Sequence, residues 1–340
     1  MGIIKNTVKG HLIIGLMTVL LLPAFSSCDQ QGNGDFVINE IMASNHSSIM
    51  AKDGELHDWI EIKNISGKPA SLSGYSLVVE KNANDSEEGS EVKQKSWDLP
   101  AVELKAGECV VIFASKKNSS DPKGELHAGF KLSSKGGKVQ LLKGGSVISE
   151  IEYSPLEDDQ CLKRQDDGSY IASYEATPGA DNNDQGLEQC QAAIEGQRTG
   201  SLRVWELYPK GDKNGEAWVE IKNVSDSTVN LQDYFLTTSK KDMNQYQLPN
   251  VELQPGAFYV VNGKEAGLKL TTYKTIALTR DGKFVDGLCA PPTPKGISIG
   301  HVAGKNGIFF FKSPTSGAEN TTPSSRKIES KDDDEEEDDE

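Results

Sequence analysis

The sequence contains one short phrase twice. DWIEIKN begins at Asp58, and AWVEIKN begins 159 residues later at Ala217. Three further pairs of blocks match in the same order: LSGYSL from Leu72 with LQDYFL from Leu231, LPAVELKAG from Leu99 with LPNVELQPG from Leu248, and TPGADN from Thr177 with TSGAEN from Thr315. The chain therefore builds one structural unit twice, and its length differences fall between matched blocks, where loops belong.

The matched blocks are typical of β-strands. Runs such as VINEI, WIEIKN and YSLVV are short, rich in β-branched and apolar residues, and separated by Gly, Asn, Asp, Pro or Ser. Many short strands with turn residues between them predict an all-β sandwich. We predict two tandem sandwiches with little helix, at residues 35–182 and 200–321. Residues 183–199 between them form either one short helix or a flexible linker.

Residues 1–27 are typical of a targeting segment, because two lysines precede an apolar run from Leu12 to Leu22. Small residues then lead to Cys28, which resembles the lipobox of bacterial lipoproteins, although Phe25 stands where an aliphatic residue is usual. The resemblance implies cleavage before Cys28, lipid on its thiol, an anchor linker at 28–34, and an exported, membrane-anchored protein. We expect it at the outer membrane or cell surface of a Gram-negative bacterium. Ordinary secretion is the alternative.

The chain is strongly acidic, with a formal net charge of −15. Binding to phosphate backbones needs clustered Lys and Arg, so we do not expect nucleic acid as a partner. The chain ends in KDDDEEEDDE, a run of like charges that cannot be buried and repels itself. We therefore predict a disordered acidic tail at residues 322–340.

The repeated blocks resemble the lamin tail domain, an immunoglobulin-like β-sandwich. Its pieces occur in family order in both copies: WIEIKN or WVEIKN, GYSL or DYFL, the LP-x-VEL-x-x-G block before VVIFA or YVV, and the closing TPGADN or TSGAEN. In that family the domain is a binding or scaffolding module. The resemblance implies a non-enzymatic protein without a cofactor that engages a protein or another surface partner. A carbohydrate-binding or adhesive surface lipoprotein is the alternative hypothesis.

The acids and tryptophans of the repeated phrase are the candidate binding residues. Along a strand, Trp59 and Glu61 point to one side and the aliphatic residues between them to the other. A second recurring acid could approach from a neighbouring strand, and two carboxylates could act as acid and base or share a cation. We interpret the glutamates as structural. If the repeated phrase binds a ligand, the candidate binding residues are Trp59, Glu61, Glu40, Asp58, Trp218, Glu220 and Glu206.

The tryptophans would carry the carbohydrate hypothesis by stacking on sugar rings, with Trp97 and Trp205 as further possible anchors. Trp59 and Trp218 could equally cover the outer face of a sheet. Asp58 has no counterpart, because the second copy has Ala217 at this position. Any site with three acids would therefore exist only in the first copy.

Motifs of catalysis and metal binding are not convincing in this sequence. GISIG, with His301 beside it, fits G-x-S-x-G, but that motif works only on a strand-to-helix turn and no helical pattern follows. A hydrolase would have to use Ser298 with His301, or Glu40 with Glu61. The histidines at 46, 57, 127 and 301 occur singly, without metal-ligand spacing. We predict no catalytic residue and no metal.

Four cysteines follow Cys28, and none recurs between the copies. Cys109 matches Phe258 in the repeat, so we expect a small buried apolar side chain there. If the exported protein forms one disulfide, the pair we select is Cys161 with Cys190.

Overall fold

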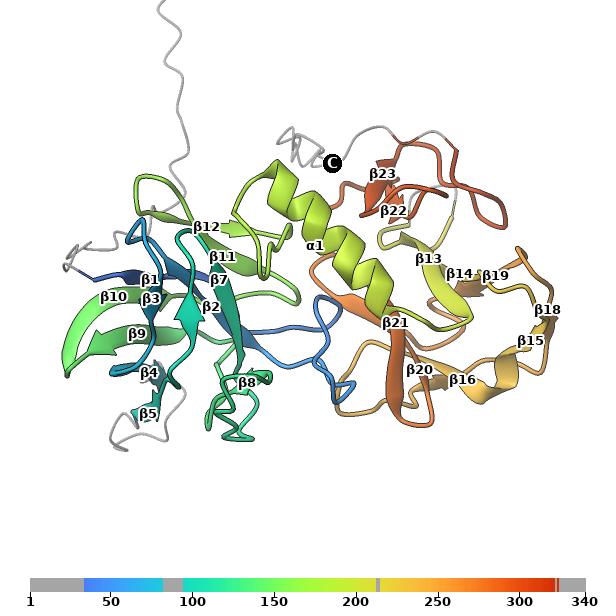
Figure 1. The fold of residues 1–340 in the computed structure, drawn as a ribbon. Coiled ribbons are helices and arrows are strands. Elements are labelled where there is room, and N and C mark those ends of the chain that lie inside the picture. Colours follow the sequence, from blue (N-terminus) through green and yellow to red (C-terminus); the bar gives the residue numbers. More distant parts are fainter. Residues whose placement is uncertain (1–33, 82–93, 212–214, 322, 324–340) are drawn as a thin grey trace, which may run out of the picture.

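The computed structural model describes residues 34–81, 94–211, 215–321 and 323. The predicted signal peptide, Cys28 and nearly all of the acidic tail lie outside the described residues. Two β-sandwiches lie side by side, with helix α1 (Asp184–Gln197) between them (Figure 1). In the described part of the chain, no helix is long and apolar enough to cross a membrane.

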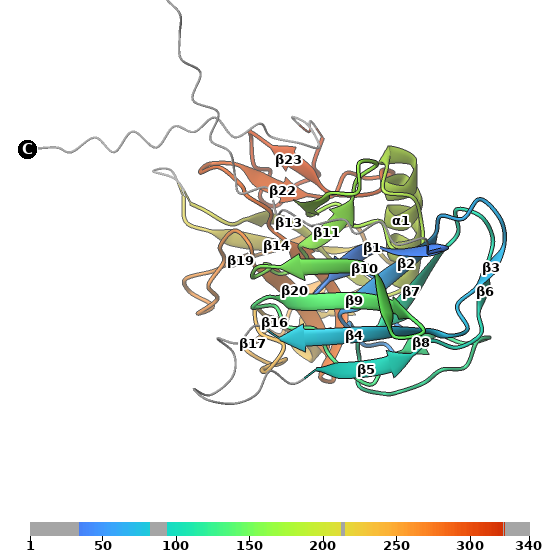
Figure 2. The ribbon, with the colours of Figure 1, turned by 90° about the vertical axis from the view of Figure 1, so that its left-hand side faces the viewer.

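The first sandwich packs a six-stranded sheet against a four-stranded one. The six-stranded sheet has the order β12 (Tyr170–Ser173), β11 (Cys161–Arg164), β1 (Phe36–Met42), β2 (Trp59–Asn64), β7 (Cys109–Phe113) and β8 (Leu126–His127). The four-stranded sheet has the order β10 (Ser146–Tyr153), β9 (Gly137–Lys143), β4 (Tyr75–Lys81) and β5 (Lys95–Asp98). Figure 2 shows this second sheet in front of β1, β2 and β7. The short strands β3 (Ala70–Ser71) and β6 (Glu103–Leu104) pair beside them.

The second sandwich repeats this plan. One sheet has the order β19 (Phe258–Asn262), β14 (Trp218–Asn223), β13 (Leu202–Tyr208), β22 (Ser298–Gly300) and β23 (Phe309–Phe311). The other has the order β17 (Tyr246–Gln247), β16 (Tyr234–Thr237), β20 (Thr275–Arg280) and β21 (Lys283–Cys289). Strands β15 (Val229–Asn230) and β18 (Glu252–Leu253) pair as β3 and β6 do, followed by the 3₁₀ helix η2 (Leu231–Asp233). The prediction of two all-β, immunoglobulin-like sandwiches is confirmed.

Alternation along the strands builds each core. Ile60 and Ile62 of β2 point inward against Leu77 of β4 and Leu141 of β9, and all four are fully buried. In the second copy Val219 and Ile221 occupy the corresponding inward positions. Burying such side chains contributes about 1.5–3 kcal/mol each. The aliphatic residues of the repeated phrase therefore belong to the hydrophobic core of each domain.

A β-bulge falls at the same place in both copies. The pairing of β1 with β2 shifts between Ile38 and Glu40, and that of β13 with β14 shifts between Val204 and Glu206. A bulge adds one unpaired residue and re-aims its neighbours. The added residue is Asn39 in the first copy and Trp205 in the second. Beyond the bulge, the recurring glutamates face each other across the strands.

The asparagine that ends the repeated phrase holds the following turn. In the second copy, buried Asn223 donates from Nδ2 to Ser227 O and Leu253 O, both at 2.8 Å. Its Oδ1 accepts from the Ser225 backbone N–H (3.0 Å) and hydroxyl (2.8 Å). Asn64 makes the equivalent bonds in the first copy. This side chain therefore ties the strand, the turn and the next strand pair together.

We predict that Asn223→Ala lowers the free energy of unfolding of the second sandwich by about 2–4 kcal/mol, because each buried polar group left unpaired costs about 1–3 kcal/mol. Urea denaturation measures the loss. Asn244→Ala, at an exposed position, is the matched control and should change stability by less than about 0.5 kcal/mol. Equal effects of the two substitutions would contradict the structural role of Asn223.

Candidate functional site

Residues 177–182 and 315–320 form two loops, which we call the closing loops. In the first copy, the backbone N–H of Thr177 donates to both oxygens of Glu40 (3.2 and 3.1 Å), and its hydroxyl donates to Oε2 (2.8 Å). The backbone N–H of Gly179 donates to Glu61 Oε2 (2.5 Å). The recurring glutamates are thus hydrogen-bond acceptors for a loop that lies more than a hundred residues away in sequence.

The second copy repeats these contacts. The backbone N–H and hydroxyl of Thr315 donate to Glu206, the hydroxyl at 2.9 Å. The Gly317 N–H donates to Glu220 Oε2. Ser298, on β22, donates its hydroxyl to Glu206 Oε1 and is fully buried. Ser298 is therefore a partner of the glutamate and not an exposed nucleophile, as the absence of a helical pattern after it predicted.

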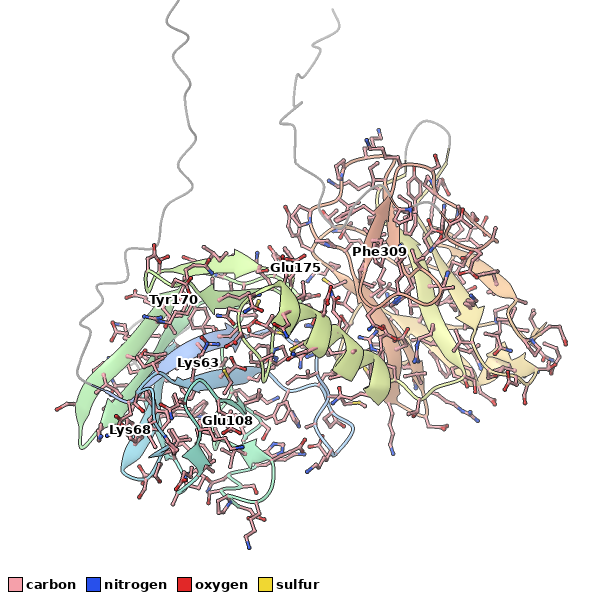
Figure 3. All side chains as sticks on the ribbon, turned by 45° about the horizontal axis from the view of Figure 1, so that its top comes forward. Lys63, Lys68, Glu108, Tyr170, Glu175 and Phe309 are labelled. Carbon is pink, nitrogen blue, oxygen red and sulfur yellow. The ribbon has the colours of Figure 1, made fainter. Side chains whose placement is uncertain are left out.

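The last two residues of each closing loop also have partners in both copies. Lys63, labelled on β2 in Figure 3, pairs with Asp181 at 2.6 Å. Lys222 pairs with Glu319 at 2.5 Å. Asn182 Nδ2 donates to Arg164 O, and Asn320 Nδ2 donates to His301 O, both at 2.9 Å. The repeated phrase and the repeated closing block thus form one structural unit in each domain.

Burial dominates the electrostatics of the glutamates. It raises the pKa of Glu61 to about 8, with a further increase from neighbouring Glu40, and the hydrogen bonds from Asn39 and Gly179 offset this only in part. Burial likewise raises the pKa of Glu220 to about 8, and the pKa values of Glu40 and Glu206 above their ordinary value. Each pair therefore favours holding a proton near neutral pH.

The two pairs differ in one donor. In the first copy, Asn39 Nδ2 donates to Glu61 Oε1 at 2.6 Å. The second copy has Trp205 at this bulge position, and Glu220 Oε1 has no hydrogen-bond partner within the described residues. Lys222 instead lies over the Trp205 ring, 4.0 Å from its centroid. The duplicated unit has thus kept its loop contacts while its bulge residue changed.

Five of the seven candidate binding residues have no exposed surface: Trp59, Glu40, Glu61, Glu206 and Glu220. Trp59 lies in a small second core on the outer face of the sheet, with Met42 and Phe113. A partner cannot contact these side chains, because the closing loop and its neighbours already cover them.

The other tryptophans are also poorly placed for stacking on a ligand. Trp218 is half-buried against Tyr208, with ring centroids 5.7 Å apart. Trp97 and Trp205 are 6% and 7% exposed. The interpretation that the phrase covers the outer sheet face therefore holds for Trp59. An exposed indole for sugar stacking is not present among the described residues.

The predicted disulfide is not formed. Cys161 and Cys190 are both free thiols. Cys161 Sγ donates to Ser173 O at 3.3 Å, and Cys190 Sγ donates to Pro178 O at 3.1 Å. Each thiol thus has its own carbonyl partner. Cys109 is half-buried rather than fully buried, and burial raises its pKa strongly.

The histidines are not all isolated, contrary to the sequence-based expectation. His57 and His127 lie with ring centroids 5.7 Å apart, and Asp53 joins them. His46 lies elsewhere, 3.6 Å from an oxygen of Asp158. His301 packs beside Trp205. Sequence reasoning missed the grouping of His57 with His127 because the two are 70 residues apart and only the fold brings them together.

A family model, the Lamin Tail Domain, matches residues 29–155 and 195–288. The chain belongs to the lamin tail domain family. These ranges include β1 to β10 and β13 to most of β21. Lamin tail domains are non-catalytic immunoglobulin-like modules, so membership indicates a binding or scaffolding module. No curated protein sequence matches the chain.

Two solved structures of an exo-chitosanase from Amycolatopsis orientalis are similar to the chain. One, a variant in complex with PNP-β-D-glucosamine, is 13% identical over 69% of this chain and 25% of that chain, with a TM-score of 0.18. The other is 13% identical over 72% and 26%, with a TM-score of 0.17. The chain spans about a quarter of the length of these proteins. Similarity this low carries no argument about activity.

The two lamin tail domains contact each other through polar groups. Asp159, in the first domain, accepts from the backbone N–H of His46 (2.6 Å) and Ser47 (2.8 Å) and from the hydroxyl of Thr275 in the second domain (2.7 Å). Cys289 donates its thiol to the carbonyl of Asp158 at 3.1 Å. A buried carboxylate is thus shared between the domains.

Helix α1 contributes to the same junction at its C-terminal end. Asn183 caps its N-terminus, accepting from Gly186 N at 2.9 Å, and Arg198 follows its last turn. Arg198 Nη1 donates to Asp286 Oδ1 of the second domain at 2.8 Å, and Nη2 donates to Ser47 O of the first. The prediction left a helix and a flexible linker open, and the structure forms the helix.

Asp58, the acid without a counterpart, lies near this junction. Its carboxylate accepts from Asn45 N at 3.3 Å, and Lys240 of the second domain donates its ammonium to Asn45 O and, at 3.4 Å, to Leu56 O. Burial raises the pKa of Asp58, and the charge of Lys240 offsets part of this shift. Asp58 therefore holds the backbone of Asn45, the residue whose carbonyl accepts from Lys240 of the second domain.

A pocket of about 150 Å³ opens at the junction and takes residues from both domains. The first domain provides His46, Glu55 and Leu56 among its lining residues. The second domain provides hydroxyl, basic and apolar side chains, which are Thr237, Thr238, Ser239, Lys240, Met243, Thr275, Lys283 and Phe284. Pockets at domain interfaces with a few convergent polar groups are common binding sites. Neither domain forms this one alone.

We predict that the stability of the protein relative to its Glu61→Gln variant falls as the pH rises from about 4.5 to about 8. The folded state holds its proton on Glu61 to higher pH than the unfolded state does, so raising the pH favours unfolding by up to about 1.4 kcal/mol per pH unit. Gln mimics the protonated acid. Urea denaturation at several pH values measures the difference.

Exposed Glu188 on α1 provides the matched control for that experiment. The pH dependence of Glu188→Gln should follow that of the unaltered protein. Parallel pH profiles for the unaltered protein and Glu61→Gln would show that Glu61 is ionised across the whole range.

Proposed function

We propose that this chain is a lipid-anchored, non-enzymatic binding protein of the bacterial envelope, in which the two lamin tail domains hold a protein partner at their junction. The observation that carries the proposal is the pocket that takes residues from both domains. Lipid on Cys28 would hold the two domains at a membrane surface, since each buried methylene adds about 0.8 kcal/mol of membrane affinity.

The recurring carboxylates have a structural role and are not placed for catalysis. A general acid or base must reach the substrate, within about 3 Å of the proton it transfers. Glu40, Glu61, Glu206 and Glu220 are fully buried and accept hydrogen bonds from the closing loops. The duplicated acids therefore stabilise the fold by holding the closing loops.

The pocket suits a protein segment that presents an apolar side chain. Met243 and Phe284 are half-buried there and offer apolar surface, while the hydroxyl of Thr238 and the ammonium of Lys283 offer polar contacts beside them. Interfaces commonly place an apolar anchor in such a pocket, with polar groups around it.

We predict that Met243→Asp abolishes capture of the partner, because a carboxylate cannot enter an apolar contact without losing its hydration. The purified chain carries a cross-linker and is incubated with detergent-solubilised envelopes, and captured proteins are identified by mass spectrometry. Ile65→Asp, at an aliphatic residue that is 45% exposed and outside the pocket lining, is the matched control.

Capture of the same proteins by Met243→Asp and by the unaltered chain would remove the junction from the proposal. Binding on a glycan array, together with no specific protein in the capture, would favour the carbohydrate alternative instead.

We predict that the chain incorporates fatty acid when it is expressed in a Gram-negative host, and that Cys28→Ala does not, because Cys28 carries the only thiol at the lipobox-like position. Metabolic labelling with a fatty-acid analogue measures this, and protease treatment of intact cells reports surface exposure. Secretion of an unlabelled chain into the medium would support ordinary secretion and contradict the anchor.

A further inference from the structure

Two histidines and one aspartate of the first domain lie close together, away from the glutamate pairs. His57 and Asp53 belong to the loop that precedes β2, and His127 belongs to β8. One ligand atom from each lies within 4.8 Å of the other two. His57 Nε2 is 3.0 Å from Asp53 Oδ2, and His127 Nε2 is 3.7 Å from Glu125 Oε2. Asp53, His57 and His127 therefore surround one small volume, with Glu125 beside His127.

These residue types suit a transition-metal dication. Zn²⁺ takes imidazole nitrogen and carboxylate oxygen at about 2.0–2.2 Å in a tetrahedron, which places neighbouring ligand atoms about 3.3 Å apart. The separation of 3.0 Å between His57 Nε2 and Asp53 Oδ2 is close to that value, and one ligand atom of His127 lies within 4.8 Å of both residues.

The surroundings orient the ligands in the way that metal sites require. The other ring nitrogen of His127, Nδ1, lies 3.0 Å from Ser115 Oγ, which leaves Nε2 free to face the cluster. Such a second partner fixes the tautomer and orientation of a metal-bound imidazole. Phe113 stacks on His127 at 5.3 Å between centroids and forms an apolar wall.

The backbone around the cluster is well defined. Ser119 and His127 exchange two backbone hydrogen bonds, at 2.8 and 2.9 Å. Asp53 Oδ1 accepts from Glu55 N at 2.8 Å, which holds the turn and leaves Oδ2 for the cluster. Hydrogen bonds therefore hold two of the three ligands, Asp53 and His127, in place.

The ammonium group of Lys117 lies against the carboxylate of the cluster. The Lys117 ammonium donates to Asp53 Oδ2, the same oxygen that lies beside His57. The Lys117 side chain is 43% exposed, so it can swing into water when a dication takes its place. A cation bound to Asp53 and the ammonium would exclude each other, because like charges repel at this distance.

We infer that Asp53, His57 and His127 bind one transition-metal dication of the Zn²⁺ type, with water as the fourth ligand, in competition with the Lys117 ammonium. The site does not depend on the proposed function, because it uses none of the pocket-lining side chains named above. Its two histidines and one carboxylate favour Zn²⁺, Co²⁺ or Ni²⁺ over Mg²⁺ and Ca²⁺, which prefer oxygen ligands alone.

The test is calorimetric titration of the purified, chelator-treated chain with Zn²⁺, together with the visible spectrum of the Co²⁺ complex. We expect one ion per chain. His57→Gln and His127→Gln should each weaken binding by more than about 100-fold, since losing an outer-shell partner alone costs about 10–100-fold. Ser115→Ala should weaken it by about 10-fold. Lys117→Ala should strengthen it, which a purely structural Asp53–Lys117 ion pair would not predict.

Two controls separate this site from other cation-binding groups in the chain. His46→Gln removes a histidine outside the cluster and should leave the affinity unchanged. Calcium should bind only weakly, and equally in all variants, through the acidic tail. Thermal unfolding without Zn²⁺ checks that each variant folds. The same measurement with Zn²⁺ reports binding, because an ion that binds the folded state raises the melting temperature.

The outcomes decide the inference in both directions. One Zn²⁺ per chain that is lost in His57→Gln and His127→Gln, with a Co²⁺ spectrum free of thiolate absorption, supports the site. No binding by the unaltered chain and by Lys117→Ala, undiminished binding by the histidine variants, or a thiolate spectrum would each overturn it.

Discussion

Each sandwich depends on two buried carboxyl groups that face each other across neighbouring strands. Glu40 lies opposite Glu61, and Glu206 lies opposite Glu220, directly after a β-bulge. Buried carboxyls are costly unless hydrogen-bond donors surround them. The closing loops provide these donors from their backbone and from a threonine hydroxyl. The closing loop therefore provides the hydrogen-bond donors that the buried carboxyls of the sheet require, and these carboxyls in turn hold the loop against the sheet.

The first closing loop also connects the fold of one domain to the position of the next. Helix α1 begins at Asp184, directly after this loop, and the thiol of Cys190 donates to the loop carbonyl of Pro178. At the other end of the helix, Arg198 bonds to both domains. A continuous series of contacts thus runs from the buried glutamates to the contact between the two domains.

The strand pattern predicted more of the fold than of the site. Alternation correctly placed Ile60 and Ile62 in the core, and the repeat predicted two domains of the same kind. Alternation also separated Glu61 and Trp59 from the core, but it reports only which side of a sheet a residue occupies. The group that covers Glu61 on that side is the backbone N–H of Gly179, which is 118 residues away in sequence. The repetition of TPGADN as TSGAEN, blocks without a strand pattern, was the available signal for a shared structural role. Asp53, His57 and His127 had no such signal, because they occur once.

The junction between the domains uses different surfaces of the two copies. Asp159 of the first domain accepts from Thr275 of the second, and Lys240 of the second domain donates to Asn45 O, whose backbone N–H donates to Asp58. The register of β11 and β22 places Gly296 where the first copy has Asp159, and the second copy has Ala217 in place of Asp58. The contact is therefore heterologous, the type that can extend into a filament when every unit carries both surfaces. The second domain has neither of these two acids at the corresponding positions, so it does not offer the same surface to a further lamin tail domain.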